Sequence, residues 1–209
     1  MKTLLAVDSS PLGTESSVSR QLTAEFVEKW QQAHPDGKVI RRDLITTPLE
    51  AVSAEWIAAA HTPEDKLTAR QREILGTSGE LIAELNAADE YVFGVAMHNF
   101  SIPAVLKLWI DQVARAGKTF SYEGGAPAGL LHGKTTTFLV SSGGVYDQGT
   151  PMAAMNFVEP YLRSMFRFIG VTDTRFINAS GTARLLFGSD RATVLQPARA
   201  SIHAQFQAA

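Results

Sequence analysis

The sequence of 209 residues contains no cysteine. This absence excludes disulfide bonds, thiolate catalysis and cysteine metal sites, and it suits a reducing compartment. An excess of charge of one sign is also missing, because 19 lysines and arginines stand against 21 aspartates and glutamates. Nucleic-acid-binding proteins usually carry a basic face, so this balance argues against a nucleic-acid partner.

Long hydrophobic runs are missing as well. The apolar run from Met1 to Val7 is too short for a signal-peptide core or a membrane span. No other apolar run is long enough to span a bilayer. We therefore expect a cytoplasmic protein with no membrane partner. The hydrophobic share of 45% is ordinary for a globular protein, and we expect residues 1–209 to form a single domain.

What the sequence does contain is an alternation of short apolar runs and amphipathic stretches. Continuous apolar runs indicate strands buried on both faces of a parallel sheet; they lie at 4–7, 39–40, 91–95, 137–140 and 176–177. Helical spacing predicts helices at 22–30, 68–88, 103–113, 157–169 and 191–206, with Pro197 either interrupting the last helix or marking its start. Two long stretches, 44–67 and 115–133, have no clear period.

This alternation predicts an α/β fold with a doubly wound sheet. A dinucleotide-binding fold would carry GxGxxG after its first strand, and neither that motif nor the P-loop pattern is present. We therefore predict a flavodoxin-like sheet of five parallel strands in the order 2-1-3-4-5, with helices on both faces. Ligands of such sheets bind beyond the carboxyl ends of the strands.

The loop after the first predicted strand is rich in serine. Ser9, Ser10 and the segment from Ser16 to Ser19 precede or open the first helix. A helix N-terminus offers free N–H groups to a phosphate, and serine hydroxyls add donors. Simple capping by Ser16 or Ser17 would explain one serine but not several.

Two further loops fall on the same predicted edge. Met97, His98, Asn99 and Phe100 follow the third strand, and the segment Ser141-Ser142-Gly143-Gly144 follows the fourth. Each alone fits an ordinary turn, although paired glycines allow a backbone to approach a ligand closely. Together the three loops describe a site for a flat polar ring with a phosphate tail, and FMN fits that description.

The chain resembles the bacterial FMN-dependent NADH azoreductases, also known as NADH:quinone oxidoreductases. The resemblance extends over nearly the whole chain, and it is the ordered combination of segments that is specific. The segments are Ser9-Ser10, Ser17 to Leu22, Arg42-Asp43-Leu44, Met97 to Phe100, Val113 to Gly117 with Thr119-Phe120, Ser142-Gly143-Gly144 and Phe168 to Val171.

The resemblance implies a bound FMN, electrons supplied by NADH or NADPH, and ping-pong transfer of two electrons to quinones or to azo compounds. It also implies a homodimer with both active sites at the interface. The implied FMN contacts are Ser10, Ser17, Val18 and Ser19 at the phosphate, Met97, His98, Asn99 and Phe100 along the ribityl chain and ring, and Ser141, Ser142, Gly143 and Gly144 at the pyrimidine. Phe120 and Tyr122 are implied to flank the substrate pocket.

No protein side chain is expected to act as a catalytic residue or to bind a metal, because the flavin carries the redox chemistry. His98 departs from the family, which usually has tyrosine there, and we interpret it as a loop residue without a titrating role. One alternative function is a non-catalytic flavodoxin-type electron carrier. A flavin-free regulatory module is another, although Asp8 stands alone after the first strand. A serine hydrolase would need Ser9 or Ser10 with a base such as His203.

Overall fold

The computed structural model describes residues 1–207 and contains a central five-stranded parallel sheet. Its strands are β1 (Thr3–Asp8), β2 (Lys38–Asp43), β3 (Glu90–Ala96), β6 (Thr135–Ser141) and β7 (Asp173–Ala179). Their order is β2-β1-β3-β6-β7, and every neighbouring pair is parallel. The predicted order 2-1-3-4-5 is therefore confirmed.

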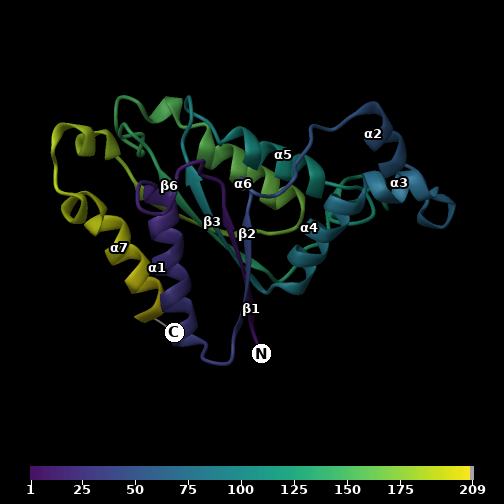
Figure 1. The fold of residues 1–209 in the computed structure, drawn as a ribbon, viewed down its shortest axis with the longest axis horizontal. Coiled ribbons are helices and arrows are strands. Elements are labelled where there is room, and N and C mark those ends of the chain that lie inside the picture. The colour runs from purple at the N-terminus through teal and green to yellow at the C-terminus, as the bar shows by residue number, and fades with distance from the viewer. Residues whose placement is uncertain (208–209) are drawn as a thin grey trace.

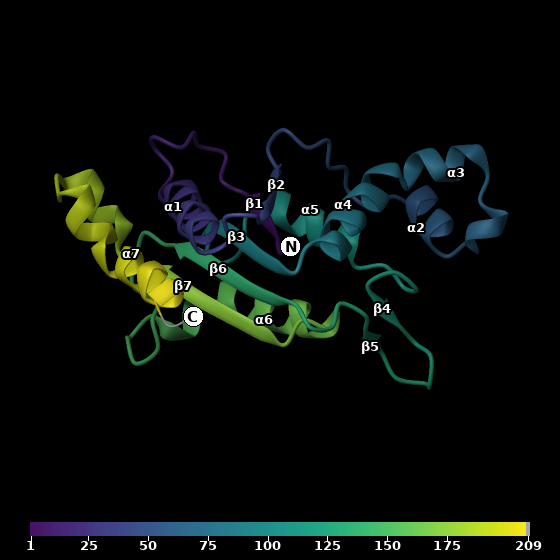
Figure 2. The same cartoon turned by 90° about the horizontal axis from the view of Figure 1, so that it is seen from below.

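Helices cover both faces of this sheet (Figure 1, Figure 2). One face carries α1 (Val18–Ala33) and α7 (Arg191–Gln207), which pack on each other. The other face carries α4 (Gly76–Ala87), α5 (Ala104–Val113) and α6 (Val158–Phe168). Gly170, just after α6, has a φ of 105°, so the predicted helix end at this glycine is confirmed.

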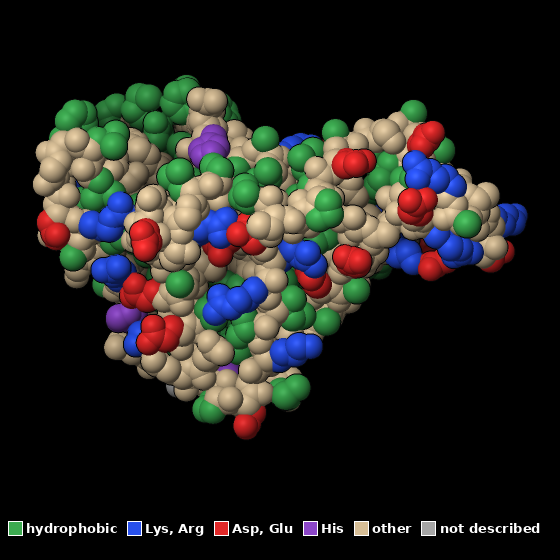
Figure 3. Space-filling view, in the orientation of Figure 1, with side chains coloured by type: hydrophobic (Ala, Val, Ile, Leu, Met, Phe, Trp, Pro, Cys, Tyr) green, Lys and Arg blue, Asp and Glu red, His purple; other side chains and the backbone are tan. Residues whose placement is uncertain are grey.

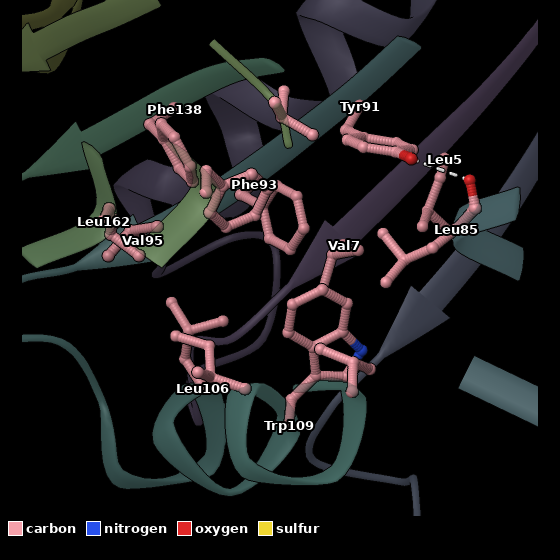
Figure 4. Close-up of a cluster of buried hydrophobic side chains, with 14 of the residues drawn as sticks. Leu5, Val7, Leu85, Tyr91, Phe93, Val95, Leu106, Trp109, Phe138 and Leu162 are labelled. Atoms are coloured by element: carbon pink, nitrogen blue, oxygen red, sulfur yellow. Dashed lines mark hydrogen bonds between the residues drawn. The ribbon is translucent and has the colours of Figure 1, made fainter. Parts of the chain in front are cut away.

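The apolar core on the α5 side is dense in aromatic rings (Figure 4). Phe93 of β3 lies 5.2 Å from Trp109 of α5 and 5.5 Å from Phe138 of β6, measured between ring centroids. Tyr91 is also buried, and its hydroxyl donates to the Leu85 carbonyl at 2.7 Å. Burial of its polar end is thus matched by a hydrogen bond, as a close-packed interior requires.

The predicted helix over 68–88 is wrong in one respect, because it is two helices. α3 (Ala69–Ile74) ends before Leu75, and α4 begins at Gly76. Leu75 is buried against Trp56 and Ala59, away from the main core. Glycine has low helix propensity, so Gly76 and Gly79 weaken the helix at this point. The helix therefore breaks where Leu75 packs into this second cluster.

Pro197 neither interrupts nor begins the last helix, which is a correction to both expectations. α7 is continuous through it. Proline removes the amide that would bond to the carbonyl of Thr193. Both residues are exposed, so water can satisfy that carbonyl.

The two stretches without a clear period contain short elements that the sequence did not reveal. The first holds α2 (Ala54–Ala60), capped by the Ser53 hydroxyl, and the short turn η1 (Glu64–Lys66). The second holds a small antiparallel hairpin of β4 (Phe120–Ser121) and β5 (Ala128–Gly129). α2, η1 and α3 form an arm that projects from one side of the sheet (Figure 1), while the hairpin contacts α6 and extends separately on the same side (Figure 2).

The arm is joined to the main body by polar contacts. Trp56 Nε1 donates to Gln112 Oε1 at 2.9 Å, and Gln112 Nε2 donates to the Glu50 carbonyl at 3.0 Å. Within residues 1–207, no helix is long and apolar enough to cross a membrane.

Candidate functional site

The carboxyl ends of β1, β3, β6 and β7 meet at one edge of the sheet, where a cavity of about 330 Å³ opens. We call it the edge cavity. Its volume lies in the range of small-molecule sites. It is lined by Ser10, Pro11, Leu12, Ser16, Ser17, Val18, Ala96, His98, Ser141, Gly143, Thr182, Ala183, Leu185, Leu186 and Arg191.

The N-terminus of α1 forms one wall of the edge cavity. Ser17 has extended backbone angles, and its hydroxyl accepts from the Arg20 amide at 3.3 Å, so it is the N-cap. The first-turn amides of Val18 and Ser19 have no acceptor among residues 1–207, as is general for helix starts. The first turn contains no acidic side chain, so these donors and the helix dipole are available to an anion.

The serines of this loop divide into ligand-facing and structural residues. Ser9 Oγ donates to the Gly94 carbonyl at 2.7 Å, and Ser19 is fully buried with its hydroxyl 3.3 Å from that of Ser17. Ser10 and Ser17 line the edge cavity. Only some of the serines can therefore offer side chains to a ligand, and the contribution of Ser19 would come from its amide.

A single guanidinium holds the backbone of this loop in place. Arg20 donates Nε and Nη2 to the Ser10 carbonyl at 3.1 and 2.8 Å, and Nη2 also bonds to Asp43 Oδ1 at 2.8 Å. That bond lowers the pKa of Asp43, against the effect of partial burial. Fixing the Ser10 carbonyl also fixes the peptide plane, and hence the position of the Ser10 side chain at the cavity.

Asp8 lies beneath this loop at the end of β1. Its Oδ1 atom is buried and has no hydrogen-bond partner among the described residues, and its Oδ2 is 3.8 Å from Arg20 Nη1. Burial raises the pKa of Asp8, and the nearby guanidinium opposes that effect.

The loop after β3 has an unusual backbone. Asn99 and Phe100 have φ values of 47° and 70°, a left-handed conformation that non-glycine residues rarely adopt. His98 and Ser101 exchange two backbone hydrogen bonds, at 2.9 and 3.0 Å, which closes a tight turn around them. The Phe100 carbonyl accepts from the Phe157 amide at 3.1 Å, so the turn is held from α6 as well.

This conformation leaves polar groups of the turn available. Asn99 is exposed, and the amides of Asn99 and Phe100 have no acceptor within residues 1–207. His98 is exposed and lines the edge cavity. The Phe100 ring meets the Tyr146 ring edge to face, with 6.0 Å between centroids.

The carbonyls of the glycine loop after β6 are bonded to the segment after β7. The Ser142, Gly143 and Gly144 carbonyls accept from the amides of Thr182, Ala183 and Gly181 at 2.9, 3.1 and 2.8 Å respectively. The amides of Gly143 and Gly144 have no acceptor in the described part of the chain. Such amides can stabilise negative charge on a ligand, as an oxyanion hole does.

The segment after β7 is a part of the site that sequence reasoning missed. The turn η3 (Thr182–Phe187) supplies four lining residues, and Arg191 at the start of α7 brings a guanidinium. Gly181, with a φ of 72°, begins this turn. The sequence could have indicated this segment, because the fifth predicted strand is parallel to the others and its carboxyl end lies at the same edge. The loop that follows it could therefore have been added to the predicted site.

Apolar side chains cluster beside the cavity. Leu186 and Phe187 of η3 are 84% and 86% exposed, and Val145 and Met152 after β6 are about half exposed. Figure 3 shows apolar atoms gathered over this part of the surface. Contiguous exposed apolar side chains of this kind favour an interaction surface.

The structure brings the three predicted loops to the edge cavity, and six of the predicted residues line it: Ser10, Ser17, Val18, His98, Ser141 and Gly143. Ser19 lies behind them and is fully buried. Met97, Asn99, Phe100, Ser142 and Gly144 belong to those loops without lining the cavity itself. Ser142 turns its hydroxyl to the Gly144 carbonyl at 3.0 Å.

Phe120 and Tyr122 are not brought to the edge cavity. Phe120 packs against Phe168, the last residue of α6, with 4.5 Å between ring centroids, and its ring meets that of Tyr122. The start of α6 adjoins the Phe100 turn, so the 11 residues of α6, roughly 15 Å, separate the two places.

The geometry of the serine-hydrolase alternative is also absent. The Ser9 hydroxyl is bonded to a carbonyl, and His203 Nε2 lies 2.8 Å from Glu25 Oε1, on the outer surface of α1 and α7. Neither Ser9 nor Ser10 has a histidine partner among residues 1–207.

Free amides at a helix N-terminus and in two adjoining loops suit FMN. The phosphate can bind at the N-terminus of α1 without a lysine, and the polar edge of the ring can bind at Gly143 and Gly144. The edge cavity therefore has the donor set for such a group.

Comparisons with known proteins agree with this fold. A family model described as "Flavodoxin-like fold" matches residues 2–206. An FMN-dependent NADH:quinone oxidoreductase of Acidobacterium capsulatum is 54% identical, covering 94% of this chain and 95% of its own length. One from Burkholderia lata is 44% identical, with coverages of 97% and 98%.

Solved structures are also similar. An azoreductase from Bacillus anthracis str. Sterne has a TM-score of 0.85 and 29% identity, covering 98% of this chain and 100% of its own. An FMN-dependent NADH-azoreductase from Bacillus anthracis str. Ames Ancestor, solved in complex with FMN, has a TM-score of 0.87 and 25% identity, with 99% of each chain covered.

Proposed function

Because this chain belongs to the flavodoxin-like family, we propose that it is an FMN-dependent oxidoreductase that transfers two electrons per catalytic cycle from NADH or NADPH to quinones and to azo compounds. Two such cycles supply the four electrons that cleave one azo bond to two amines. The observation that carries the proposal is the pair of amides of Val18 and Gly143 at one cavity, unpartnered within residues 1–207, each followed in sequence by a further unpartnered amide, of Ser19 and of Gly144. We also propose that residues 1–209 are a single FMN-binding domain.

When bound, FMN supplies the redox chemistry, and the chain supplies binding and orientation. The α1 N-terminus and the hydroxyls of Ser10 and Ser17 would hold the phosphate. The turn from Met97 to Phe100 would border the ribityl chain and ring. The loop from Ser141 to Gly144 would present its amides to the pyrimidine edge, where they favour negative charge.

The non-catalytic carrier is the weaker alternative. Relatives with high identity are named as oxidoreductases rather than carriers. The net charge of -2 is also modest, whereas carriers tend to be strongly acidic for docking.

The first test is the visible spectrum of the purified protein before and after anaerobic NADH. We expect two flavin absorption bands that bleach with NADH and return with a quinone. Parallel initial-rate lines would support the ping-pong order. A spectrum that stays unchanged with both NADH and NADPH would indicate a carrier, and failure to take up FMN would indicate a flavin-free module.

We further propose a homodimer whose active sites lie at the interface. Phe120 and Tyr122 lie far from the edge cavity of their own chain, and Tyr122 is 61% exposed. A second copy can bring these aromatics to the cavity, and the exposed Leu186 and Phe187 offer apolar contact area.

Subunit mixing tests this arrangement. Ser17→Asp keeps a good N-cap but repels a phosphate, and Tyr122→Ala removes the exposed ring. A mixed dimer would contain one intact site built from the cavity of one chain and the Tyr122 of the other. We expect mixing to regain activity that neither variant has alone; no regain, or a monomer by sedimentation, would contradict the proposal.

We keep the cytoplasm as the proposed location. A chain without cysteine is compatible with its reducing conditions, and electron donors of the NADH class are held there. Cell fractionation with an antibody to the chain tests this.

A further inference from the structure

A second, larger cavity lies between the arm and the main body. Its volume is about 940 Å³, and it shares no lining residue with the edge cavity. We call it the cationic cleft. Its walls come from the end of α2 and the η1 turn, from α3 and α4, and from the turn after α5; among the lining residues are His61, Glu64, Leu67, Arg72, Arg115 and Lys118.

The floor of the cationic cleft contains a buried guanidinium with no carboxylate in contact with it among the described residues. Arg115 is 9% exposed, and no carboxylate lies within 4.0 Å of it among residues 1–207. Nη1 donates to Ser78 Oγ at 3.2 Å, and Nε is buried with no partner. Burial lowers the pKa of Arg115, and the negative charge of Glu64, beyond contact distance, opposes this effect. A buried charge left in this state is costly unless another group compensates it.

The helix end beside Arg115 does not supply that compensation. Arg115 follows α5, where carbonyl groups carry partial negative charge. The Gln112 carbonyl, however, already accepts from the Ser78 hydroxyl at 2.6 Å. Arg115 is therefore bonded to a neutral hydroxyl whose own proton is directed elsewhere.

The mouth of the cleft adds positive charge. The Lys118 ammonium pairs with the Glu64 carboxylate, and Arg72 Nη2 donates to the Glu64 carbonyl at 3.1 Å. Glu64 is the sole carboxylate among the described lining residues, and its side chain is 69% exposed. Three cations thus face one solvated anion, and the cleft attracts negative ligands.

The remaining walls are mixed, with apolar side chains between polar ones such as Thr62 and Asn86. Leu67, Leu75 and Ile82 line the cleft together with alanines of α2 and α4. Sites with mostly apolar walls and a few convergent polar groups are typical of small organic ligands, and this volume falls in their range. A purely inorganic anion would leave these walls unused.

We propose that the cationic cleft binds a small organic carboxylate with a compact apolar body, whose carboxylate meets Arg115 and Lys118 while its body packs on Leu67, Leu75 and Ile82. This is a binding site beyond the proposed electron transfer. It requires neither flavin uptake nor turnover, so its failure and that of the proposed function are distinguishable.

The experiment is calorimetric titration of the FMN-loaded protein with 2-naphthoate. The neutral 2-naphthalenemethanol and inorganic phosphate serve as separate probes of the apolar body and the charge. We expect naphthoate to bind at least about tenfold more tightly than either, since a charge-assisted hydrogen bond and apolar burial each contribute about that factor. Equal affinity for the neutral analogue or for phosphate would overturn the proposal.

Variants locate the site. Arg115→Gln should weaken naphthoate binding about tenfold or more, and Lys118→Gln by a smaller factor that shrinks at high salt. Arg175→Gln removes an exposed cation on β7 and should leave binding unchanged. Circular dichroism checks the fold; if Arg115→Gln does not fold, Lys118→Gln decides, because its side chain is 38% exposed. Wild-type affinity in Lys118→Gln would overturn the proposal.

Discussion

The edge cavity and the cationic cleft lie near opposite ends of α5, and they differ in how their charged groups are satisfied. At the edge cavity, Arg20 is bonded to a carboxylate and to a backbone carbonyl of its own chain. At the cleft, Arg115 has one neutral hydroxyl partner and no carboxylate within 4.0 Å in residues 1–207.

The edge cavity is therefore preorganised, whereas the cationic cleft contains a side-chain donor without a hydrogen-bond partner in the described part of the chain. Besides the Arg191 guanidinium, which bonds only to Gln21 among residues 1–207, the donors left free at the edge cavity are backbone amides, whose positions are set by helix and loop geometry. The free donor at the cleft is a side chain, for which a buried position without a partner is unfavourable. The arm also has its own small cluster around Trp56 rather than a share of the main core, so it is less rigidly supported.

The largest expected effect comes from breaking the Arg20 contacts. Arg20→Gln removes the charged donor that holds Ser10, and hydrogen bonds from charged groups contribute about 1.5–3 kcal/mol. We expect the FMN dissociation constant, measured by quenching of flavin fluorescence, to rise by about tenfold to a hundredfold. Arg41→Gln, an exposed change on the same strand as Asp43, is the control; an equal rise there would contradict the role of Arg20.

A matched pair of glycines compares the rigidity of the two regions. A Cβ on Gly94 of β3 would lie 2.4 Å from Thr23 Oγ1 and 2.9 Å from Asp8 Oδ1, whereas Gly79 of α4 has nothing within 4 Å. We expect Gly94→Ala to lower the free energy of unfolding by about 1–3 kcal/mol. Gly79→Ala should raise it by about 0.5–1 kcal/mol through helix propensity. Chemical denaturation measures the free energy of unfolding of both variants. Equal changes in the two would contradict a difference in rigidity between the regions.

Asp8 provides a test of burial at the edge cavity. Because burial raises its pKa, the folded state binds this proton more tightly than the unfolded state. Its favourable contribution is therefore present below the unfolded value of 3.8 and is lost as pH rises through the folded pKa. We therefore expect Asp8→Asn to raise the free energy of unfolding at pH 7, because asparagine carries no charge to bury. If urea denaturation at pH 7 gave a lower free energy of unfolding for Asp8→Asn than for the wild type, the sign would be contradicted.

The smallest effect is expected at His98. Its backbone closes the tight turn with Ser101, while its ring is exposed. We expect His98→Tyr to leave the shape of the pH–rate profile unchanged. A shifted inflection near neutral pH would show that the imidazole titrates in turnover.

Periodicity and loop chemistry in the sequence were sufficient to predict the sheet order, the helices on its faces and the three loops of the edge cavity. Strands such as Tyr91 to Val95 are buried on both faces, so their continuous apolar runs are visible in the sequence. The loops follow because parallel strands place all their carboxyl ends at one edge. The family resemblance extended this to FMN and to named residues.

Tertiary structure alone decided three other features. The arm was not predictable because its short helices depend on contacts such as Trp56 with Gln112, which are distant in sequence. The separation of Phe120 from the edge cavity depends on which end of α6 it packs against. The buried, carboxylate-free position of Arg115 depends on where α4 and α5 meet. Local patterns record propensity and burial, but only the packed chain determines which distant groups become neighbours.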